Sequence, residues 1–500
     1  MGNGLANIAV KHSFFKKIGF SLMLSAALAL SAVAPGAALA EQNAAQAGET
    51  DNTIALQLLQ VFQTIQQNHI SGVSERELAD IAIKAMIESL NDPYTTYMSK
   101  EEFESFFQSI EQQVVGIGIR VGQDDGGFYV AEVLDNTPAA AGGILPDDYI
   151  EAVNGNSVDG MNLDQLVSAI TGKEGTSVTV TVRRGDRSLD LAFVRKAFSV
   201  SAAQSKLLDG NVGYISLSGF SDEGAKSFAA RLADLKANGM KALIVDLRGN
   251  PGGTVQSALD IAKQFIKEGT LMLMRDKNGK TQTVPINGGS TVQVPVTVLV
   301  NETTASAAEV LSGALQDYKA ATLIGTKTFG KGSVQNVYSL AGGAGLKVTS
   351  EEYMTPKGRK VNQVGITPDI TVEGDVPQLI AALRQSGQSD FTLRIQKHAI
   401  ELNGARFINV VPVVAEEDEV FVPTRILAAL IGAEAQWNIE SQSVELRAGD
   451  RTETFAVAEG EARNDSGTSL IALSRMSAKF PQLSWTNANG QIEIRVTKGN

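Results

Sequence analysis

Strand and helix patterns alternate through the middle of this sequence, and the alternation limits the fold more than any other feature. Three apolar runs have the length of buried strands, namely VGYISLS (212–218), KALIVDLRG (241–249) and VTVLV (296–300). Helical patterns lie between and after them, near Asp222 to Ala237, near Gly253 to Glu268, and in the segment that holds Ser306. This order predicts an α/β layer with at least partly parallel strands.

The N-terminus has the features of a secretory signal. Lys11, Lys16 and Lys17 precede the apolar stretch IGFSLMLSAALALSAVAP, and Ala38-Leu39-Ala40 then places small residues where a signal peptidase reads them. We expect cleavage after Ala40 and an extracytoplasmic mature protein. The alternative is a retained transmembrane anchor, since the stretch approaches the length that spans a bilayer.

Composition excludes several classes of function. The net charge of −12 disfavours nucleic acid and bare anionic membranes as partners. The chain has no cysteine, which removes disulfides, thiolate metal sites and a thiol nucleophile. Its histidines, His12, His69 and His398, lie in unrelated segments. A zinc site is therefore not expected, and we predict neither metal nor cofactor.

A chain of 500 residues is too long for a single hydrophobic core, so several domains are expected. The segments on either side of the alternating region have different hydrophobic periodicities. Apolar residues recur at helical spacing from Ile54 to Ile65, and a second helix is predicted from Glu75 to Leu90 with Ser74 as N-cap. We therefore predict a multidomain α+β fold with these parts: a signal peptide (1–40), a helical N-terminal region (50–110), a β-rich domain (111–196), an α/β core (197–375) and an α+β repeat domain (391–500).

The β-rich domain resembles a PDZ domain. Its runs GIGIRV, FYVAEVL, YIEAVNG and SVTVTVRRG surround a short helical pattern, and TPAAAGGILPDDYIEAVNGNSV closely matches that family's core. The resemblance implies that a peptide's C-terminus lies against a strand edge, with its carboxylate on backbone amides of a glycine loop. The corresponding residues are Val115, Gly116, Ile117, Gly118 and Ile119. Alternatively, these glycines only relieve crowding at a bend.

The last segment contains an internal repeat. FVPTRILAALIGAEAQWNIESQSVELR and LIALSRMSAKFPQLSWTNANGQIEIR share the order apolar run, Arg, short helix, Trp, turn and strand. The repeat resembles a stalk-type domain related to the N-terminal domain of copper amine oxidases, although no copper ligands are present. Trp437 and Trp485 could form a sugar-stacking surface, but a core position in each half is the preferred interpretation.

Ser306, at the predicted strand-to-helix junction, is a candidate nucleophile. A serine hydroxyl needs a neighbour that takes its proton, and no histidine is well placed to do so. Lys331, between two glycines in TFGKGSVQ, could act as a neutral amine if buried. Gln335 would share its face of a strand and orient it. The alternatives are a capping hydroxyl for Ser306 and an exposed turn lysine for Lys331.

The loop DLRGNPGG, residues 246–253, could supply amides to the same site. Its glycines free backbone N–H groups at a strand end, a geometry that binds anions. Gly252 or Gly253 would then donate to an oxyanion together with Ala307, which lies at the positive end of the helix dipole. The alternative is a plain strand-to-helix turn.

Together these motifs resemble the carboxyl-terminal processing peptidases, tail-specific serine proteases with a Ser-Lys dyad. The matching segments include LNDPYTTYMSKEEF, VGYISLSGFS, DLRGNPGG, NETTASAAEVL, IGTKTFGKGSVQ and YMTPKGRKVNQVGITPDI. The resemblance covers about residues 50 to 375 and implies a PDZ domain inserted before an α/β Ser-Lys protease core. It implies Ser306 as nucleophile, Lys331 as base and Gln335 as its partner. One departure is Ala308, where the family often has a second serine.

The resemblance also implies the partners. Substrates would be proteins or peptides with accessible C-termini, cut through an acyl-enzyme, and the N-terminal helices would allow a homodimer. The N-terminal signal allows association with a membrane or cell wall. Two alternatives stay open: a non-catalytic envelope scaffold that binds peptides, and an amidase or esterase that acts on cell-wall material with the same dyad.

Overall fold

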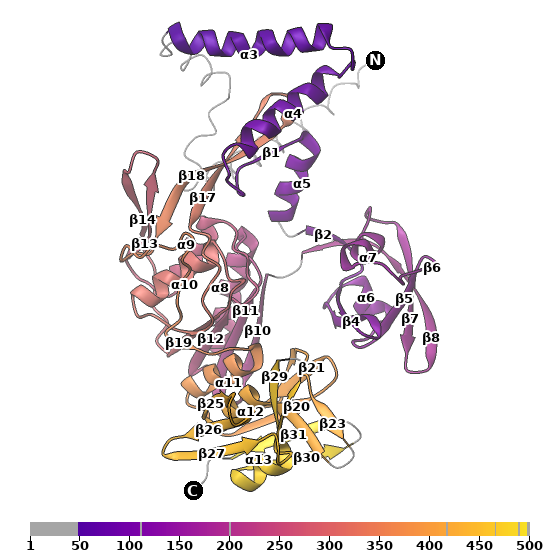
Figure 1. Ribbon diagram of the computed structural model, residues 1–500, viewed down its shortest axis with the longest axis vertical. Coiled ribbons are helices and arrows are strands. Elements are labelled where there is room, and N and C mark those ends of the chain that lie inside the picture. Colours follow the sequence, from indigo (N-terminus) through magenta and orange to yellow (C-terminus); the bar gives the residue numbers. More distant parts are fainter. Residues whose placement is uncertain are drawn as a thin grey trace, which may run out of the picture.

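The computed structural model describes residues 49–110, 113–199, 202–416, 419–465, 467–488 and 491–497. The predicted signal peptide lies outside these residues. Over the part described, no helix combines the length and apolarity that are needed to cross a bilayer. Figure 1 shows the N-terminal helices at the top, the α/β core in the middle, the β-rich domain beside it and the C-terminal domain at the bottom.

The N-terminal region is helical, as predicted. It consists of α3 (Glu49–Asn68), α4 (Glu75–Glu88), the short strand β1 (Thr96–Met98) and α5 (Lys100–Ile110). The Ser74 hydroxyl accepts a hydrogen bond from the Glu77 amide, which confirms Ser74 as the N-cap of α4. Strand β1 pairs with a strand of the core, so this region is tied to the core by backbone hydrogen bonds.

The β-rich domain closes around its own apolar core. Its elements are β2 (Gln113–Gly116), β3 (Ile119–Asp124), β4 (Gly127–Val133), α6 (Pro138–Gly142), β5 (Tyr149–Val153), β6 (Asn156–Ser157), α7 (Leu163–Ile170), β7 (Ser177–Arg184), β8 (Arg187–Val194) and β9 (Lys196–Ser199). The sheet runs in the order β3-β4-β5-β7-β8, with β6 on β5, and β2 pairs with β9 separately. Alternate residues of β7, including Val178, Val180 and Val182, face the core.

The central core is the predicted α/β layer. Its main sheet has the order β10-β11-β12-β15-β16-β19, in which β10 is antiparallel and the others are parallel. Its elements are β10 (Ala203–Leu208), β11 (Val212–Leu217), α8 (Asp222–Ala237), β12 (Ala242–Asp246), α9 (Val255–Ala262), β13 (Gly269–Asp276), β14 (Thr281–Ile286), β15 (Val296–Val300), α10 (Ala307–Asp317), β16 (Thr322–Gly325), β17 (Ser333–Ser339), β18 (Gly345–Met354) and β19 (Ile370–Thr371). Strands β1, β18, β13, β14 and β17 form a second, antiparallel sheet.

Both faces of the main sheet are buried, which explains its continuous apolar strands. In β12, Leu243 and Val245 pack in one cluster with residues of α8, α9 and α10. Ala242 and Ile244 pack on the other face, with α11 (Asp375–Gln385) and residues of the C-terminal domain. The core and the C-terminal domain therefore share one apolar cluster and are not joined by a linker alone.

The C-terminal domain has the predicted internal repeat. Its elements are β20 (Phe391–Ile395), β21 (Ala399–Leu402), β22 (Ala405–Ile408), β23 (Val414–Glu416), β24 (Glu419–Pro423), α12 (Thr424–Ile431), β25 (Glu434–Asn438), β26 (Ser443–Ala448), β27 (Arg451–Ala456), β28 (Ala462–Asp465), β29 (Thr468–Ala472), α13 (Leu473–Lys479), β30 (Leu483–Ala488) and β31 (Gln491–Val496). Strand, helix and hairpin recur as β24-α12-β25-β26 and β29-α13-β30-β31. Trp437 and Trp485 are partly buried against the shared cluster, in agreement with the core interpretation.

Candidate active site

The candidate site lies at the carboxyl ends of the parallel strands β12 and β15, in the middle of the main sheet. Hydrogen bonds of asparagine side chains and backbone amides connect the loops that follow these strands. Asn301 accepts hydrogen bonds from the amide of Gly249 (3.1 Å), and Asn250 donates from its side chain to the carbonyl of Leu217 (2.7 Å). The Ala305 amide donates to the Asn250 carbonyl (2.9 Å). These bonds hold the segment before α10 against the glycine loop.

Ser306 has a strained backbone conformation at the start of α10. Its φ of 55° and ψ of −120° differ from those of an ordinary N-cap, such as Ser221 with φ −117° and ψ 167°. Positive φ is uncommon for a residue with a side chain and costs on the order of 1–3 kcal/mol. A sharp, strained strand-to-helix turn is a known way to expose a nucleophilic serine. The conformation therefore favours the nucleophile interpretation over the capping one.

The carboxylate of Glu309 joins the Ser306 turn to the loop that carries Lys331. Glu309 is fully buried. Its Oε2 accepts from the amides of both Ser306 and Lys331, each at 2.9 Å. Its Oε1 accepts from the Thr328 hydroxyl (2.5 Å) and the Gly330 amide (2.7 Å). Burial raises the pKa of Glu309, although the hydrogen bonds that it accepts act in the opposite direction. One carboxylate thus brings the two predicted catalytic residues together.

Lys331 has the environment that a neutral amine needs. Burial lowers the pKa of its amine below the ordinary value, and the positive charge of Lys347 lowers it further. The Lys331 Nζ lies 4.9 Å from the ring centroid of Tyr94, a residue of the N-terminal region. Among the described contacts, no hydrogen bond joins this amine to the Ser306 hydroxyl. A Ser-Lys dyad requires a hydrogen bond between this amine and the Ser306 hydroxyl.

The predicted contact between Gln335 and Lys331 is not formed. The Gln335 side-chain amide donates to the hydroxyls of Ser333 (2.9 Å) and Thr349 (3.4 Å). The prediction assumed that residues 331 and 335 share one face of a strand. Strand β17 begins only at Ser333, and its pairing with β18 shifts register between Val334 and Gln335. A register shift breaks the period of two on which the prediction depended.

The predicted oxyanion donors separate into free and occupied amides. The amide of Gly252 donates to Asn250 Oδ1 at 2.8 Å, so it is engaged within its own loop. Within the described residues, no acceptor is bound to the amides of Gly253 and Ala307. This arrangement favours Gly253 over Gly252 as the donor that accompanies Ala307.

Both glycines are nevertheless required by the space around them. Gly253 has φ 148°, and a Cβ there would lie 2.0 Å from the Phe220 carbonyl oxygen. At Gly252, a Cβ would lie 2.8 Å from both the Ser306 Cβ and the Ala307 nitrogen. The missing side chain of Gly252 therefore lets the loop approach the Ser306 turn.

In the β-rich domain, the predicted loop from Val115 to Ile119 offers free backbone donors. Carbonyls of Ile117 and Gly118 accept from the amides of Ala139 (2.8 Å) and Leu134 (2.9 Å). In the described structure, the amides of Ile117 and Gly118 have no partner. Val115 and Gly116 belong to β2, and Ile119 begins β3. Two adjacent unpaired N–H groups are therefore available to an anion.

Helix α7 supplies an apolar surface beside this loop. The Gly172 amide, just after α7, donates to the Val115 carbonyl at 3.2 Å. Leu166 is buried in one cluster with Ile117. Leu163 and Val167 are 42% and 43% exposed, so apolar side chains of the same helix stay open to a ligand.

Four stretches of the chain match known domain families. Residues 24–102 match the Activating protease CtpB N-terminal domain, 104–183 a PDZ domain, 211–372 Peptidase family S41 and 389–473 the Copper amine oxidase N-terminal domain. The chain is 37% identical over 318 residues to the carboxy-terminal processing protease CtpA of Bacillus subtilis, and the match covers 63% of this chain and 68% of that protein. The chain belongs to peptidase family S41. It is a serine peptidase of the carboxy-terminal processing type and carries a PDZ domain.

This S41 peptidase is also similar to other proteins. A probable CtpA-like serine protease of Staphylococcus aureus is 33% identical over 328 residues, which are 65% of this chain and 66% of that protein. The solved photosystem II D1 C-terminal processing protease is 26% identical, with a TM-score of 0.41 over 67% of this chain and 97% of that one. A putative S41 protease from Bacteroides fragilis is 17% identical, with a TM-score of 0.45 over 60% of this chain and 87% of that one.

Sequence reasoning missed two residues of the candidate site, Glu309 and Tyr94. Glu309 stands three residues after Ser306, the spacing of a capping box, so this signal was present in the sequence. Tyr94 lies in the quoted segment LNDPYTTYMSKEEF, but nothing local shows that its ring reaches Lys331, which lies far along the chain. Over the described ranges, no cluster of three His, Asp, Glu or Cys side chains could hold a metal ion.

Replacing Glu309 by glutamine tests its joining role. An amide presents an acceptor on one side only, so its NH₂ group would face two of the donors that now bind the carboxylate. We expect the free energy of unfolding to fall by about 2–4 kcal/mol and peptide cleavage to fall on the order of 100-fold. Urea denaturation and cleavage assays measure both effects.

The matched control is Glu302→Gln in the same loop. Glu302 is exposed and accepts from the Thr326 hydroxyl (2.9 Å). We expect the free energy of unfolding of this variant to stay within about 0.5 kcal/mol of that of the parent. Equal behaviour of the two variants would contradict the role assigned to Glu309.

Proposed function

We propose that this chain is an extracytoplasmic serine endopeptidase that binds the C-terminal tail of a protein substrate with its PDZ domain and cleaves it with Ser306 and Lys331. The observation that carries the proposal is the Glu309 carboxylate, which accepts from the amides of both residues at 2.9 Å. The strained φ of Ser306 and the lowered pKa of the Lys331 amine support the same roles.

The chemistry proceeds in two balanced steps. The neutral Lys331 amine takes the proton of the Ser306 hydroxyl as its oxygen attacks the scissile carbonyl carbon. The resulting oxyanion accepts hydrogen bonds from the free amides of Gly253 and Ala307. The ammonium then returns the proton to the leaving amine, and an acyl-enzyme remains. Water, deprotonated by the same amine, hydrolyses the ester and restores the serine.

The contact of Lys331 with Tyr94 belongs to a resting state in this scheme. A cation above an aromatic ring is favoured in its charged form, so this position opposes deprotonation of the amine. Rotation toward Ser306 removes that contact and brings the amine to the hydroxyl. Catalytic hydrogen bonds often form only in the substrate complex, which is consistent with an incomplete dyad here.

The PDZ domain would recognise the tail through two features. The free amides of Ile117 and Gly118 would bind the terminal carboxylate, and the exposed side chains of Leu163 and Val167 would contact apolar side chains of the tail. Strand β3 lies at an edge of its sheet, so a peptide can add to it as a further strand.

Replacing Val167 by aspartate tests this recognition. The new charge would face the apolar tail, and we expect kcat/KM for a peptide with an apolar C-terminus to fall about tenfold, mainly through KM. A short ester substrate without a tail should be cleaved at the parent rate. A peptide of the same sequence with a C-terminal amide lacks the carboxylate. The parent should cleave it with a similarly reduced kcat/KM.

Val194→Asp is the matched control for this experiment. Val194 is 56% exposed on β8, at the opposite edge of the PDZ sheet from β3. We expect this variant to cleave the tailed peptide normally. If tail and tail-less substrates lost activity equally in Val167→Asp, the tail-binding proposal would be rejected.

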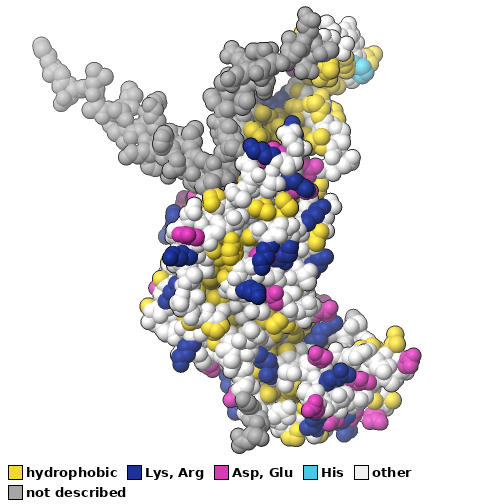
Figure 2. All heavy atoms as spheres, turned by 90° about the vertical axis from the view of Figure 1, so that its left-hand side faces the viewer, with side chains coloured by type: hydrophobic (Ala, Val, Ile, Leu, Met, Phe, Trp, Pro, Cys, Tyr) yellow, Lys and Arg dark blue, Asp and Glu magenta, His cyan; other side chains and the backbone are white. Residues whose placement is uncertain are grey.

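Exposed apolar side chains on the N-terminal helices support the proposal of a homodimer. Hydrophobic side chains gather at this end of the molecule in Figure 2. Those of α3 that are more than half exposed are Ile54, Leu56, Leu58, Leu59 and Val61. Such a patch is unusual on a monomer. Sedimentation of the full chain measures the oligomeric state.

The proposed secretion and cleavage after Ala40 have a separate test. N-terminal sequencing of protein from the culture medium measures both.

A further inference from the structure

The turn between β20 and β21 of the C-terminal domain inserts a histidine into the surface of the PDZ domain. The ring of His398 stacks on that of Tyr129 in β4, with centroids 3.6 Å apart and an interplanar angle of 12°. The His398 side chain is only 2% exposed. Tyr129 and Tyr149 are buried at this contact, although both lie on the face of the PDZ sheet that points away from its own core.

Both ring nitrogens of His398 face carboxylates of the PDZ domain. Nδ1 lies 2.7 Å from Asp147 Oδ1, and Nε2 lies 3.0 Å from Asp124 Oδ2. An ionised carboxylate only accepts hydrogen bonds, and a neutral imidazole carries a single N–H. Both bonds can therefore form together only when the ring is protonated. The docked arrangement binds one proton more than a separated, neutral histidine does.

The groups around His398 complete a charge-complementary contact. From the C-terminal domain, the Lys397 ammonium bonds the Tyr149 hydroxyl and lies 3.3 Å from the Asp124 carboxylate. From the PDZ domain, the Tyr149 hydroxyl donates to Asp124 (2.7 Å), and Arg183 of β7 stacks over the Tyr149 ring. Burial alone would raise the pKa of Asp124, but hydrogen bonds from Tyr149 and His398 outweigh it and hold this pKa well below its usual range.

We propose that the C-terminal domain is the docking partner of the PDZ domain and that His398 makes this docking depend on a proton. The C-terminal domain shares an apolar cluster with the protease core, so a PDZ domain docked on it is held in a defined position beside the core. The docked surface comprises the outer face of β4 and β5 together with Asp124 at the end of β3. Leu163 and Val167 of α7 stay exposed beside it.

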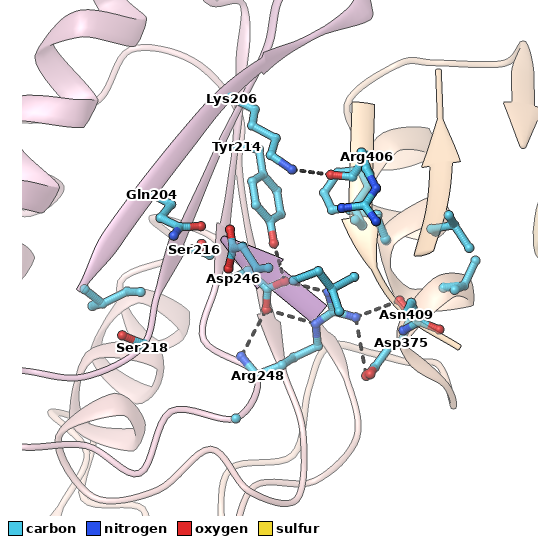
Figure 3. A pocket seen from close by; sticks show the side chains of 18 of the residues that line it. Gln204, Lys206, Tyr214, Ser216, Ser218, Asp246, Arg248, Asp375, Arg406 and Asn409 are labelled. Atoms are coloured by element: carbon cyan, nitrogen blue, oxygen red, sulfur yellow. Dashed lines mark hydrogen bonds and ion pairs between the residues drawn. The ribbon is translucent and has the colours of Figure 1, made fainter. Parts of the chain in front are cut away.

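A cavity of about 590 Å³ lies where the three parts meet, and docking supplies one of its walls. Arg120 and Glu132 line it from the PDZ domain. Figure 3 shows Tyr214, Asp246 and Arg248 of the core on one side and Arg406 and Asn409 of the C-terminal domain across from them. Separation of the PDZ domain would open this cavity, so docking controls the space next to the catalytic loops without contact to Ser306.

The absence of cysteine from the chain makes the docking directly measurable. Asp186→Cys, in the turn between β7 and β8, and Asp450→Cys, between β26 and β27, place one fluorophore on each domain at exposed positions. Single-molecule energy transfer in the full chain then reports the docked and separated populations. The readout needs no peptidase activity, so its outcome is independent of the proposed function.

We expect mainly the docked population at about pH 5.5 and a loss of docking toward about pH 8, where imidazole is neutral. Because the docked arrangement holds one proton more, the ratio of docked to separated molecules should fall as the pH rises, by up to about tenfold per pH unit. His398→Ala should be mainly separated at both values. Asp147→Asn removes one charged acceptor from an exposed side chain and should reduce the docked ratio by roughly tenfold without a risk to folding.

His69→Ala is the control, because His69 is exposed in the N-terminal region and should leave the populations unchanged. A parent protein whose docked population did not change with pH would overturn the proton dependence. Energy transfer in His398→Ala and Asp147→Asn equal to that of the parent would overturn the role of His398, and a parent with no docked population at about pH 5.5 would overturn the docking itself.

Discussion

Replacing Ser306 by alanine is expected to reduce peptide cleavage by on the order of 10⁴-fold or more, with the fold retained. In the proposed mechanism, the hydroxyl oxygen is the atom that forms the acyl-enzyme, and no neighbouring group replaces it. A fluorophosphonate probe should label the parent protein and not the variant. Cleavage of a tailed peptide, followed by mass spectrometry, measures the loss.

Two other substitutions separate the chemistry from the structure of this turn. Thr303→Ala alters an exposed hydroxyl in the same loop, which donates only to Asn301, and should retain nearly full activity. Ser306→Gly should be inactive but more stable than Ser306→Ala by about 1 kcal/mol in thermal unfolding, since glycine tolerates the φ of 55°. Cleavage at the parent rate by either Ser306 variant would remove the assignment of the nucleophile.

Replacing Lys331 by arginine is expected to be almost as damaging as the loss of Ser306. A guanidinium stays protonated at any pH at which the protein is folded, so it cannot accept the serine proton. Residues that act as one unit are not additive, so the Ser306→Ala, Lys331→Arg double variant should be little worse than either single variant. Single-turnover cleavage of a tailed peptide measures all three.

The lowered pKa of Lys331 also sets the sign of the pH dependence. In the proposed mechanism the neutral amine is the active form, so kcat/KM should rise with pH and level off above this pKa, with an inflection below the ordinary lysine value of 10.5. Lys347→Gln removes the neighbouring positive charge and should move the inflection to higher pH. Lys277→Gln, at an exposed position in another hairpin, should leave it unchanged. An inflection that moved to lower pH in Lys347→Gln would contradict Lys331 as the base.

Local patterns were sufficient for the order of domains and for the α/β core. The apolar runs at 212–218, 241–249 and 296–300 became the parallel strands β11, β12 and β15, because strand and helix periods depend only on neighbours in sequence. The internal repeat around Trp437 and Trp485 could likewise be predicted from the sequence. The same patterns predicted that Ser306 lies at a strand-to-helix junction.

The details of the site depended on backbone geometry that no local pattern contains. Gln335 was expected beside Lys331, but the register shift in β17 directs it to Ser333 and Thr349. Sequence left Gly252 and Gly253 equivalent, and only the hydrogen bond from Gly252 to Asn250 distinguishes them. The spacing of three residues between Ser306 and Glu309 could be recognised in the sequence as that of a capping box. The hydrogen bonds from the Lys331 loop to Glu309 could be found only in the folded structure.

By itself, the sequence determined which segments are strands and helices, which domains they form and which residue types could carry a serine peptidase reaction, since these follow from composition and short-range period. Only the tertiary structure decided that Tyr94 covers Lys331, that the C-terminal domain shares the core's apolar cluster, and that His398 meets Asp124 across 274 residues of chain. Contacts of that separation arise from the packing of whole domains, and packing leaves no periodic trace in the sequence.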